Sequence, residues 1–184
     1  MRNVDDCGKI KRARGEAEET FEMKTLLCKL GKKLGYEVDV EESPESELGE
    51  LMVRHDVLWY VKRPDWYSRL LSIVLSRDDL DLEYRKLVEG KARVERQLYV
   101  AFEIEGSDAT TKAMKGTTSN LSKLPCGIIV VKRGRKEARE EGVEPIRNRF
   151  EKALLEFKAL HGPNNVMVVS FGDVRKLAEE LGVK

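Results

Sequence analysis

Residues 100–105 read VAFEIE, a short apolar run that carries two carboxylates two positions apart. A strand points alternate side chains to opposite faces, so Glu103 and Glu105 share one face and the apolar residues between and before them occupy the other. A second apolar run, Met52–Lys62 (MVRHDVLWYVK), sets Asp56 among strand-forming residues. Three acids on neighbouring strands are a plausible magnesium site, because hard cations prefer carboxylate oxygen.

The elements around these two strands follow from hydrophobic periodicity. The pattern predicts helices over Glu16–Leu34, Trp66–Leu75, Asp79–Glu89, Ala109–Lys123, Pro145–Leu160 and Asp173–Leu181, and strands over Tyr36–Val40, Met52–Lys62, Leu98–Glu105, Gly127–Val131 and Val166–Ser170. Strands and helices alternate in the second half, and parallel neighbours require crossover connections. We therefore predict an α/β fold, with a mixed sheet flanked by helices on both faces.

The length of 184 residues fits one compact domain. We interpret residues 16–62 and 96–131 as its core and residues 132–184 as a C-terminal α/β extension. Residues 64–95 read as a helical insertion between the strand that carries Asp56 and the strand that carries the Glu-x-Glu pair.

Composition excludes several classes of protein. The chain has 34 basic and 33 acidic residues, so its net charge of +1 gives no global attraction to nucleic acid. No window approaches about 18 consecutive apolar residues, and the N-terminus lacks the apolar core of a secretory signal. Cys7, Cys28 and Cys126 are odd in number and far apart, which argues against a disulfide framework and a CxxC zinc site. We expect no membrane contact, reduced cysteines and a cytoplasmic location.

The order of elements and the carboxylates together resemble the PD-(D/E)xK nuclease superfamily, whose fold is called restriction-endonuclease-like. The resemblance covers roughly residues 16–131, and residue by residue it implies that Asp56 is the metal-binding Asp and Glu103 the acid of the following strand. Glu105 falls where most members carry lysine, so the chain is a Glu-x-Glu variant. The implied cofactor is Mg²⁺ or Mn²⁺, with Asp56, Glu103 and Glu105 as ligands.

The usual lysine neutralises charge in the transition state, which a glutamate cannot do. In some members the lysine lies on the following helix, where this chain offers Lys112 and Lys115, three residues apart and therefore neighbours on one helical face. Both count as candidate catalytic and nucleic-acid-binding residues. Glu19 and Glu22, on the first helix, are weaker candidates for an additional acid of the site.

Basic and polar side chains near this site suggest a nucleic-acid surface. Ser119 continues the stripe of the two lysines, and the basic segment after Gly127–Val131 contributes Arg133, Arg135 and Lys136. Phosphate contacts of this kind release counterions and favour binding. The expected function is a metal-dependent endonuclease that hydrolyses phosphodiester bonds of nucleic acid, with DNA expected as that nucleic acid and a homodimer as one possible assembly.

Other interpretations remain open at this stage. Without the Glu-x-Lys lysine, the domain is alternatively a catalytically inactive nucleic-acid-binding or assembly module, or an α/β domain used only for protein interaction. Asp56 is alternatively an exposed residue paired with Arg54 or Arg63, and His55 is expected to be structural. Asp65 completes a literal Pro-Asp, but it follows a proline that ends the strand, so we do not assign it as a ligand.

Overall fold

The order of elements in the computed structural model is a helix, a three-stranded meander with a helical hairpin inside it, and two crossovers. Described are residues 7–42, 54–105, 111–132, 151, 152, 154, 155, 158 and 165–184, with residues 111–115 as backbone only. The elements are η1 (Cys7–Lys9), α1 (Glu18–Lys33), β1 (Glu37–Glu42), β2 (His55–Lys62), α2 (Asp65–Leu75), α3 (Leu82–Arg93), β3 (Arg96–Glu105), α4 (Thr111–Leu121), β4 (Gly127–Val131), β5 (Val166–Ser170) and α6 (Phe171–Glu180).

The five strands form one mixed sheet in the order β1-β2-β3-β4-β5. The first three pair antiparallel, and β4 and β5 continue the sheet in parallel from β3. The prediction of an α/β fold with a mixed sheet is therefore confirmed, and each predicted strand overlaps an observed one. Of the predicted helix over Pro145–Leu160, the described residues are helical and the rest lies outside the described part of the chain.

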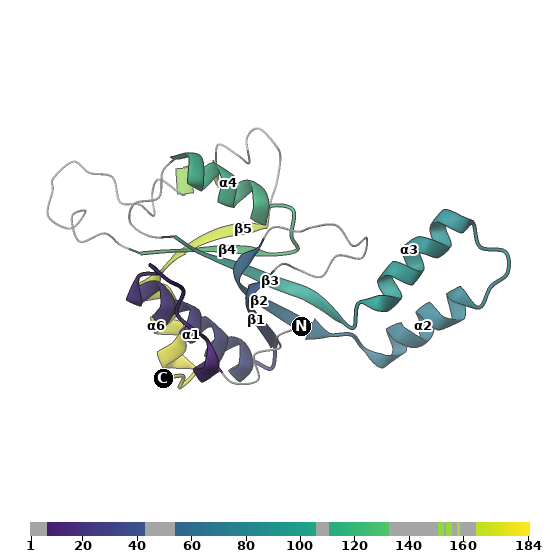
Figure 1. The fold of residues 1–184 in the computed structure, drawn as a ribbon, viewed down its shortest axis with the longest axis horizontal. Helices are drawn as coiled ribbons and strands as arrows, with labels where there is room; N and C mark the ends of the chain where they lie inside the picture. Colours follow the sequence, from purple (N-terminus) through teal and green to yellow (C-terminus); the bar gives the residue numbers. More distant parts are fainter. Residues whose placement is uncertain are drawn as a thin grey trace, which may run out of the picture.

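Helices cover both faces of the sheet, as Figure 1 shows: α1 and α6 lie on one face and α4 on the other. The first face holds the larger core, in which Leu27 and Leu30 of α1 pack on strand residues that include Val57 and Phe102. The second, smaller core is built around Leu121 at the end of α4. Among the described residues, no helix is long and apolar enough to cross a membrane.

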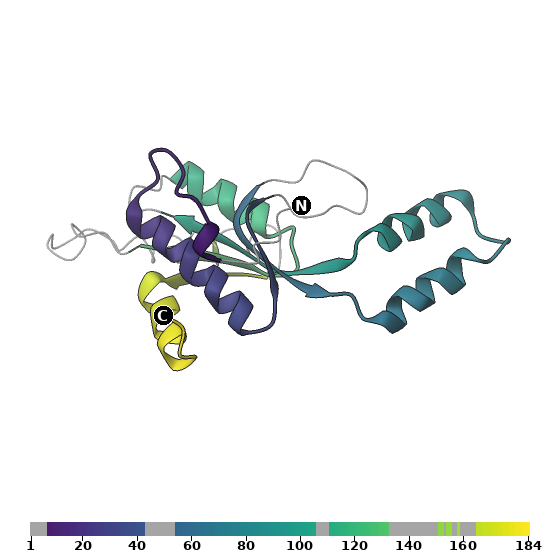
Figure 2. The same cartoon turned by 60° about the horizontal axis from the view of Figure 1, so that its bottom comes forward.

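The predicted insertion is a helical hairpin. Helices α2 and α3 connect β2 to β3 and project away from the sheet (Figures 1 and 2). The strand β2 ends at Lys62 and Pro64 precedes the first helical residue, Asp65, because proline lacks the N–H that a sheet ladder needs. Asp65 therefore lies beyond the opposite end of β2 from Asp56, which agrees with leaving it out of the site.

A close approach of backbone to side chain fixes α1 on the sheet. A Cβ added at Gly31 would lie 2.6 Å from Val38 Cγ2 and 2.6 Å from Trp59 Nε1. Trp59 is itself held in place, since its indole N–H donates to the Leu27 carbonyl at 3.1 Å. Glycine at position 31 therefore permits a helix-to-strand distance that any side chain would increase.

We expect Gly31→Ala to destabilise the protein by about 1–3 kcal/mol, the usual cost of overpacking a filled core. Gly116→Ala is the matched control, because a Cβ there meets nothing within 4 Å and Gly116 lies inside α4. That control is expected to gain about 0.5–1 kcal/mol from helix propensity. Urea unfolding of both variants measures the difference, and equal stability of the two would contradict the tight packing.

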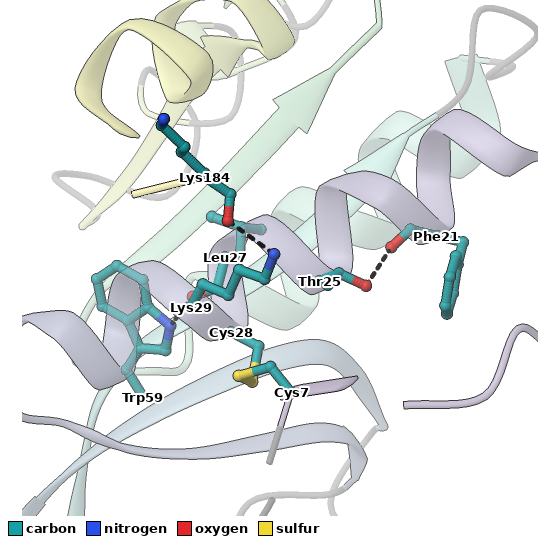
Figure 3. The surroundings of a disulfide bond; sticks show 8 residues. All are labelled: Cys7, Phe21, Thr25, Leu27, Cys28, Lys29, Trp59 and Lys184. Atoms are coloured by element: carbon teal, nitrogen blue, oxygen red, sulfur yellow. Dashed lines mark hydrogen bonds between the residues drawn. A yellow bond between two sulfur atoms is a disulfide. The ribbon is translucent and has the colours of Figure 1, made fainter. Parts of the chain in front are cut away.

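One expectation about the cysteines is wrong. Cys7 and Cys28 form a disulfide that ties η1 to α1, and only Cys126 is a free thiol (Figure 3). The separation of 21 positions in the sequence suggested separate thiols, but η1 folds back along α1 and brings the two Cα atoms to 5.9 Å. Sequence spacing gave no sign of this return of the chain.

Candidate functional site

The predicted acids of β2 and β3 lie at one end of the sheet. Phe102 and Ile104 belong to the core beneath α1 and α6, so Glu103 and Glu105 point to the face that α4 covers, as the alternation predicted. Asp56 is the second residue of β2, beside this end of β3. The two strands are hydrogen-bonded neighbours, which brings the three carboxylates into one region.

Both oxygens of Asp56 have partners. Its Oδ2 accepts a hydrogen bond from the backbone N–H of Ile104 at 2.7 Å, and its Oδ1 lies 3.1 Å from the ammonium of Lys24. Asp56 therefore bridges the start of β2, the end of β3 and helix α1. The pairing with Arg54 or Arg63 that the sequence left open is not found, because Arg54 binds Glu41 and Arg63 binds carbonyls at the end of α3.

Lys24 is the centre of a buried charge cluster. Its side chain is 6% exposed, and its ammonium lies 2.6 Å from Glu16 Oε1 and 2.7 Å from Glu41 Oε1, besides Asp56. Burial alone lowers the pKa of an ammonium group, but the three carboxylates outweigh burial and raise the pKa of Lys24. Lys24 therefore stays charged, and it places a fixed positive charge beside a predicted metal ligand.

The backbone at Glu41 is adapted to this cluster. Its φ of 57° is in the left-handed region, which costs a residue with a side chain about 1–3 kcal/mol. In this conformation the carboxylate meets Lys24 on one oxygen and Arg54 on the other. Lys24 and Arg54 lower the pKa of Glu41, with the hydrogen bond from Lys24 as the largest cause.

Glu103 is in contact with a buried histidine. The Nδ1 atom of His55 lies 2.5 Å from Glu103 Oε1, and the His55 side chain is 1% exposed. Burial raises the pKa of Glu103, His55 opposes this, and the charges of Asp56 and Glu105 raise it further. Asp56 and Glu105 therefore both lie close enough to Glu103 for their charges to act on it. His55 is thus a buried residue that also contacts a predicted ligand.

The raised pKa of Glu103 predicts a pH dependence of stability for the metal-free protein. When the pKa of a carboxyl is higher in the folded state than its unfolded value of 4.5, its contribution to the free energy of unfolding is largest below pH 4.5. That contribution is lost as pH rises through the folded pKa. Glu103→Gln removes this loss. We expect the Tm of the variant to increase relative to the Tm of the native chain as pH rises from about 4 to about 7. A difference in Tm that does not change with pH would contradict a desolvated Glu103.

The third acid is tied to the neighbouring helix. Glu105 Oε1 accepts a hydrogen bond from Thr117 of α4 at 2.6 Å. Lys112 and Lys115 lie on α4, but their side chains are outside the described part of the structure, so their roles stay predictions. Ser119 is half-buried on the same helix, and its carbonyl accepts a hydrogen bond from Ser122.

The remaining candidates divide into two groups. Glu19 forms an ion pair with Lys132, whose backbone N–H donates to the Glu105 carbonyl at 3.2 Å, so Glu19 lies at the same end of the sheet as the acids, but on α1, which covers the opposite face from Glu103 and Glu105. Glu22 instead lines a separate cavity of about 320 Å³ with Lys29, Arg175 and Lys184, which does not support it as an additional acid of this site. Arg133, Arg135 and Lys136 lie outside the described residues.

The described acids offer two carboxylate ligands for a metal ion, but no complete set of three protein ligands. Among the described residues, no group of three or more Asp, Glu, His or Cys side chains is arranged to hold an ion. Asp56 and Glu103 are nevertheless two carboxylates on adjacent strands, with 23% and 19% of their side chains exposed. Magnesium is often held by one or two carboxylates, with water and substrate phosphate as its other ligands. The donor set fits such a site.

Sequence reasoning missed several members of this region. Lys24 occupies the buried stripe of α1, three and four residues before the buried Leu27 and Cys28, and a lone lysine in such a stripe is a signal for a buried partner. Glu41 precedes the region 43–50, and nothing in its pattern pointed to the site. His55 adjoins Asp56 in the sequence but was assigned to structure alone.

Known proteins give no further guidance to the chemistry of this region. No protein-family model, curated protein or solved structure gives a significant match to the chain. The contacts and charges of the residues described above are therefore what indicates a function.

Proposed function

We propose that this chain is a metal-dependent endonuclease of the PD-(D/E)xK type, which hydrolyses phosphodiester bonds of nucleic acid, preferably DNA. The observation that carries the proposal is that Asp56 and Glu103 lie on adjacent strands, near enough for the charge of Asp56 to act on Glu103, each partly exposed and each in contact with a buried basic side chain. The topology supports it, since a helix, an antiparallel meander and a helix crossover to a parallel strand occur in the order that the resemblance implies.

The balance of charge supports a cation at this end of the sheet. Glu16, Glu41, Asp56, Glu103 and Glu105 carry five carboxylates, and among the described side chains the basic groups in contact with them are Lys24, Arg54 and His55. The excess of negative charge repels a phosphate group that arrives alone. A divalent cation reverses this field, polarises the phosphoryl oxygen and makes hydroxide available near neutral pH.

Each side chain has a defined part in this proposal. Asp56 and Glu103 hold the ion, with Asp56 oriented by the Ile104 N–H and by Lys24. Because Lys24 is 6% exposed, it acts as a positioning residue that limits repulsion among the acids and does not touch substrate. His55 orients Glu103 in the same way. Positive charge at the scissile phosphate is left to Lys112 or Lys115 of α4.

The second candidate function is a nuclease-like module that binds nucleic acid or assembles with partners but does not cleave. The observation that favours it is the engagement of both Asp56 oxygens, together with the lack of a three-ligand group among the described side chains. In this case Lys24 is a permanent structural partner of Asp56, and Asp56 offers no oxygen to a divalent cation.

Cleavage assays separate the two candidates. The native chain is incubated with supercoiled plasmid, single-stranded DNA and RNA, with Mg²⁺ or Mn²⁺ and with a chelator. We expect cleavage that requires the ion and favours DNA. Binding of nucleic acid without cleavage under every condition would support the non-catalytic module, and cleavage that survives both Asp56→Ala and Glu103→Ala would refute the assigned residues.

A cytoplasmic location belongs to the same proposal. Disulfides are rare in cytosolic proteins, with hyperthermophiles as the known exception. The pair Cys7–Cys28 and the charged fraction of 36% are both compatible with such an organism. We therefore propose an intracellular protein of a heat-adapted cell, in which the disulfide holds η1 against the second half of α1.

A further inference from the structure

The helical hairpin exposes an apolar surface that the fold does not use. Within the hairpin, Leu71 of α2 and Val88 of α3 are buried, and the two helices are in contact with each other. Trp66, Leu70 and Ile73 of α2 are 65%, 46% and 65% exposed. Their spacing of four and three residues places them in one stripe along the helix.

Helix α3 carries a second exposed stripe. Tyr84 is 52% exposed and Leu87 is 39% exposed, and three residues separate them, so they are neighbours on one helical face. We refer to Trp66, Leu70, Ile73, Tyr84 and Leu87 together as the hairpin face.

The two stripes lie on the same side of the hairpin. Successive residues of a helix are about 100° apart around its axis. Seen from the N-terminus of its own helix, each exposed stripe therefore lies roughly 100° counterclockwise from the buried side of that helix, which is marked by Leu71 in α2 and by Val88 in α3. Because α2 and α3 run antiparallel, these equal rotations point both stripes to one side. The opposite side is polar: Ser68 and Ser72 of α2 line a groove of about 590 Å³ with Ala92 and Glu95.

The hairpin face is large enough for a specific interface. From the exposed fractions of its five side chains, it presents roughly 500 Å² of mostly apolar surface, and the largest patch on an ordinary monomer is about 300–600 Å² and is often functional. The hairpin projects from the sheet (Figure 2), so the helices that cover the sheet leave this face open. Among the described elements, α2 packs mainly on α3.

We propose that the hairpin face binds the same face of a second copy of this chain. A standard interface buries about 800 Å² per partner, and homodimer interfaces are about 65% apolar, which matches roughly 500 Å² of apolar surface with a polar rim. Two flat two-helix faces pack as an intermolecular four-helix bundle about a twofold axis. The hairpin face is poorly suited to nucleic acid, because the phosphate backbone is bound by basic side chains and this face consists of aromatic and aliphatic side chains.

Oligomeric state tests the proposal without metal or nucleic acid, so the result is independent of the proposed function. Light scattering after gel filtration should give the native chain twice its 21.0 kDa mass. Ile73→Glu, alone and with Leu70→Glu, should weaken dimerisation at least about 100-fold and give a monomer. Ser72→Glu, on the polar side of α2, is the matched control and should stay dimeric.

Tryptophan fluorescence gives a second readout. The chain has two tryptophans, of which Trp59 is 6% exposed, so Trp66 dominates any change of environment. On dilution, the emission of the native chain should shift to longer wavelength as Trp66 returns to water, and the glutamate variants should show the shifted spectrum at every concentration. A native chain that is monomeric up to about 100 μM, a typical range for weak association, overturns the proposal, as does a dimer that persists in both variants.

Discussion

Asp56→Asn is expected to lower metal-dependent cleavage of DNA by about 10³-fold at saturating enzyme. A bound cation contributes several kcal/mol to the stabilisation of transition-state charge, and each 1.4 kcal/mol or so corresponds to a factor of ten in rate. The asparagine keeps an oxygen for the Ile104 N–H, so the local backbone contact survives while the charge is lost. The measurement is single-turnover cleavage of plasmid DNA with Mn²⁺.

Asp65→Asn is the matched control for this experiment. Asp65 forms the literal Pro-Asp of the sequence, but it begins α2 at the far end of β2. Its variant should cleave within about twofold of the native rate, because surface changes away from a site have small effects. Equal loss in both variants would contradict the assignment, and so would full activity in Asp56→Asn.

The largest effect on stability is expected for Lys24→Met. Removing one partner from a buried ionic cluster leaves uncompensated charge and costs about 3–5 kcal/mol. The side chains of Glu41 and Asp56 are 26% and 23% exposed, so water still solvates part of their charge. We therefore expect the free energy of unfolding to fall by about 3 kcal/mol, at the lower end of this range. For a chain of this length the loss corresponds to a fall in Tm of about 6–12 °C.

The loss caused by Lys24→Met should depend on pH in a defined direction. Lys24 lowers the folded pKa of Glu41 below its unfolded value of 4.5, so this contribution is present above 4.5 and lost as pH falls through the folded pKa. The difference between native and variant Tm should therefore shrink in acid. Lys33→Met, an exposed change on the same helix, should stay within about 0.5 kcal/mol of the native chain. A Lys24→Met variant as stable as this control would contradict the buried cluster.

Periodicity predicted most of the fold because each element has a strong local pattern. The run Gly127–Val131 is apolar throughout, as expected of a strand covered on both faces, and it is β4 with those bounds. Helix α2 was predicted to within one residue, since Pro64 marks its start. The alternation at residues 102–105 also placed the two glutamates on the correct face.

The contacts of the site were harder to predict because they join segments distant in the chain. Asp56 meets Lys24, 32 residues earlier, and Glu103 meets His55, 48 residues earlier. The disulfide of Cys7 with Cys28 was missed for the same reason. No local pattern determines such pairs, since they depend on how α1 lies across the sheet, and a tight approach at Gly31 fixes that position.

Binding of Mn²⁺ is the most direct test of the metal site, because Asp56 and Glu103 are proposed to hold a divalent cation. Titration followed by electron paramagnetic resonance should show stoichiometric binding by the native chain and by Asp65→Asn. Asp56→Asn and Glu103→Gln should each bind at least about tenfold more weakly, the effect expected when a site loses a ligand or its support. A native chain that binds no Mn²⁺, or ligand variants that bind it as tightly as the native chain, would contradict the account.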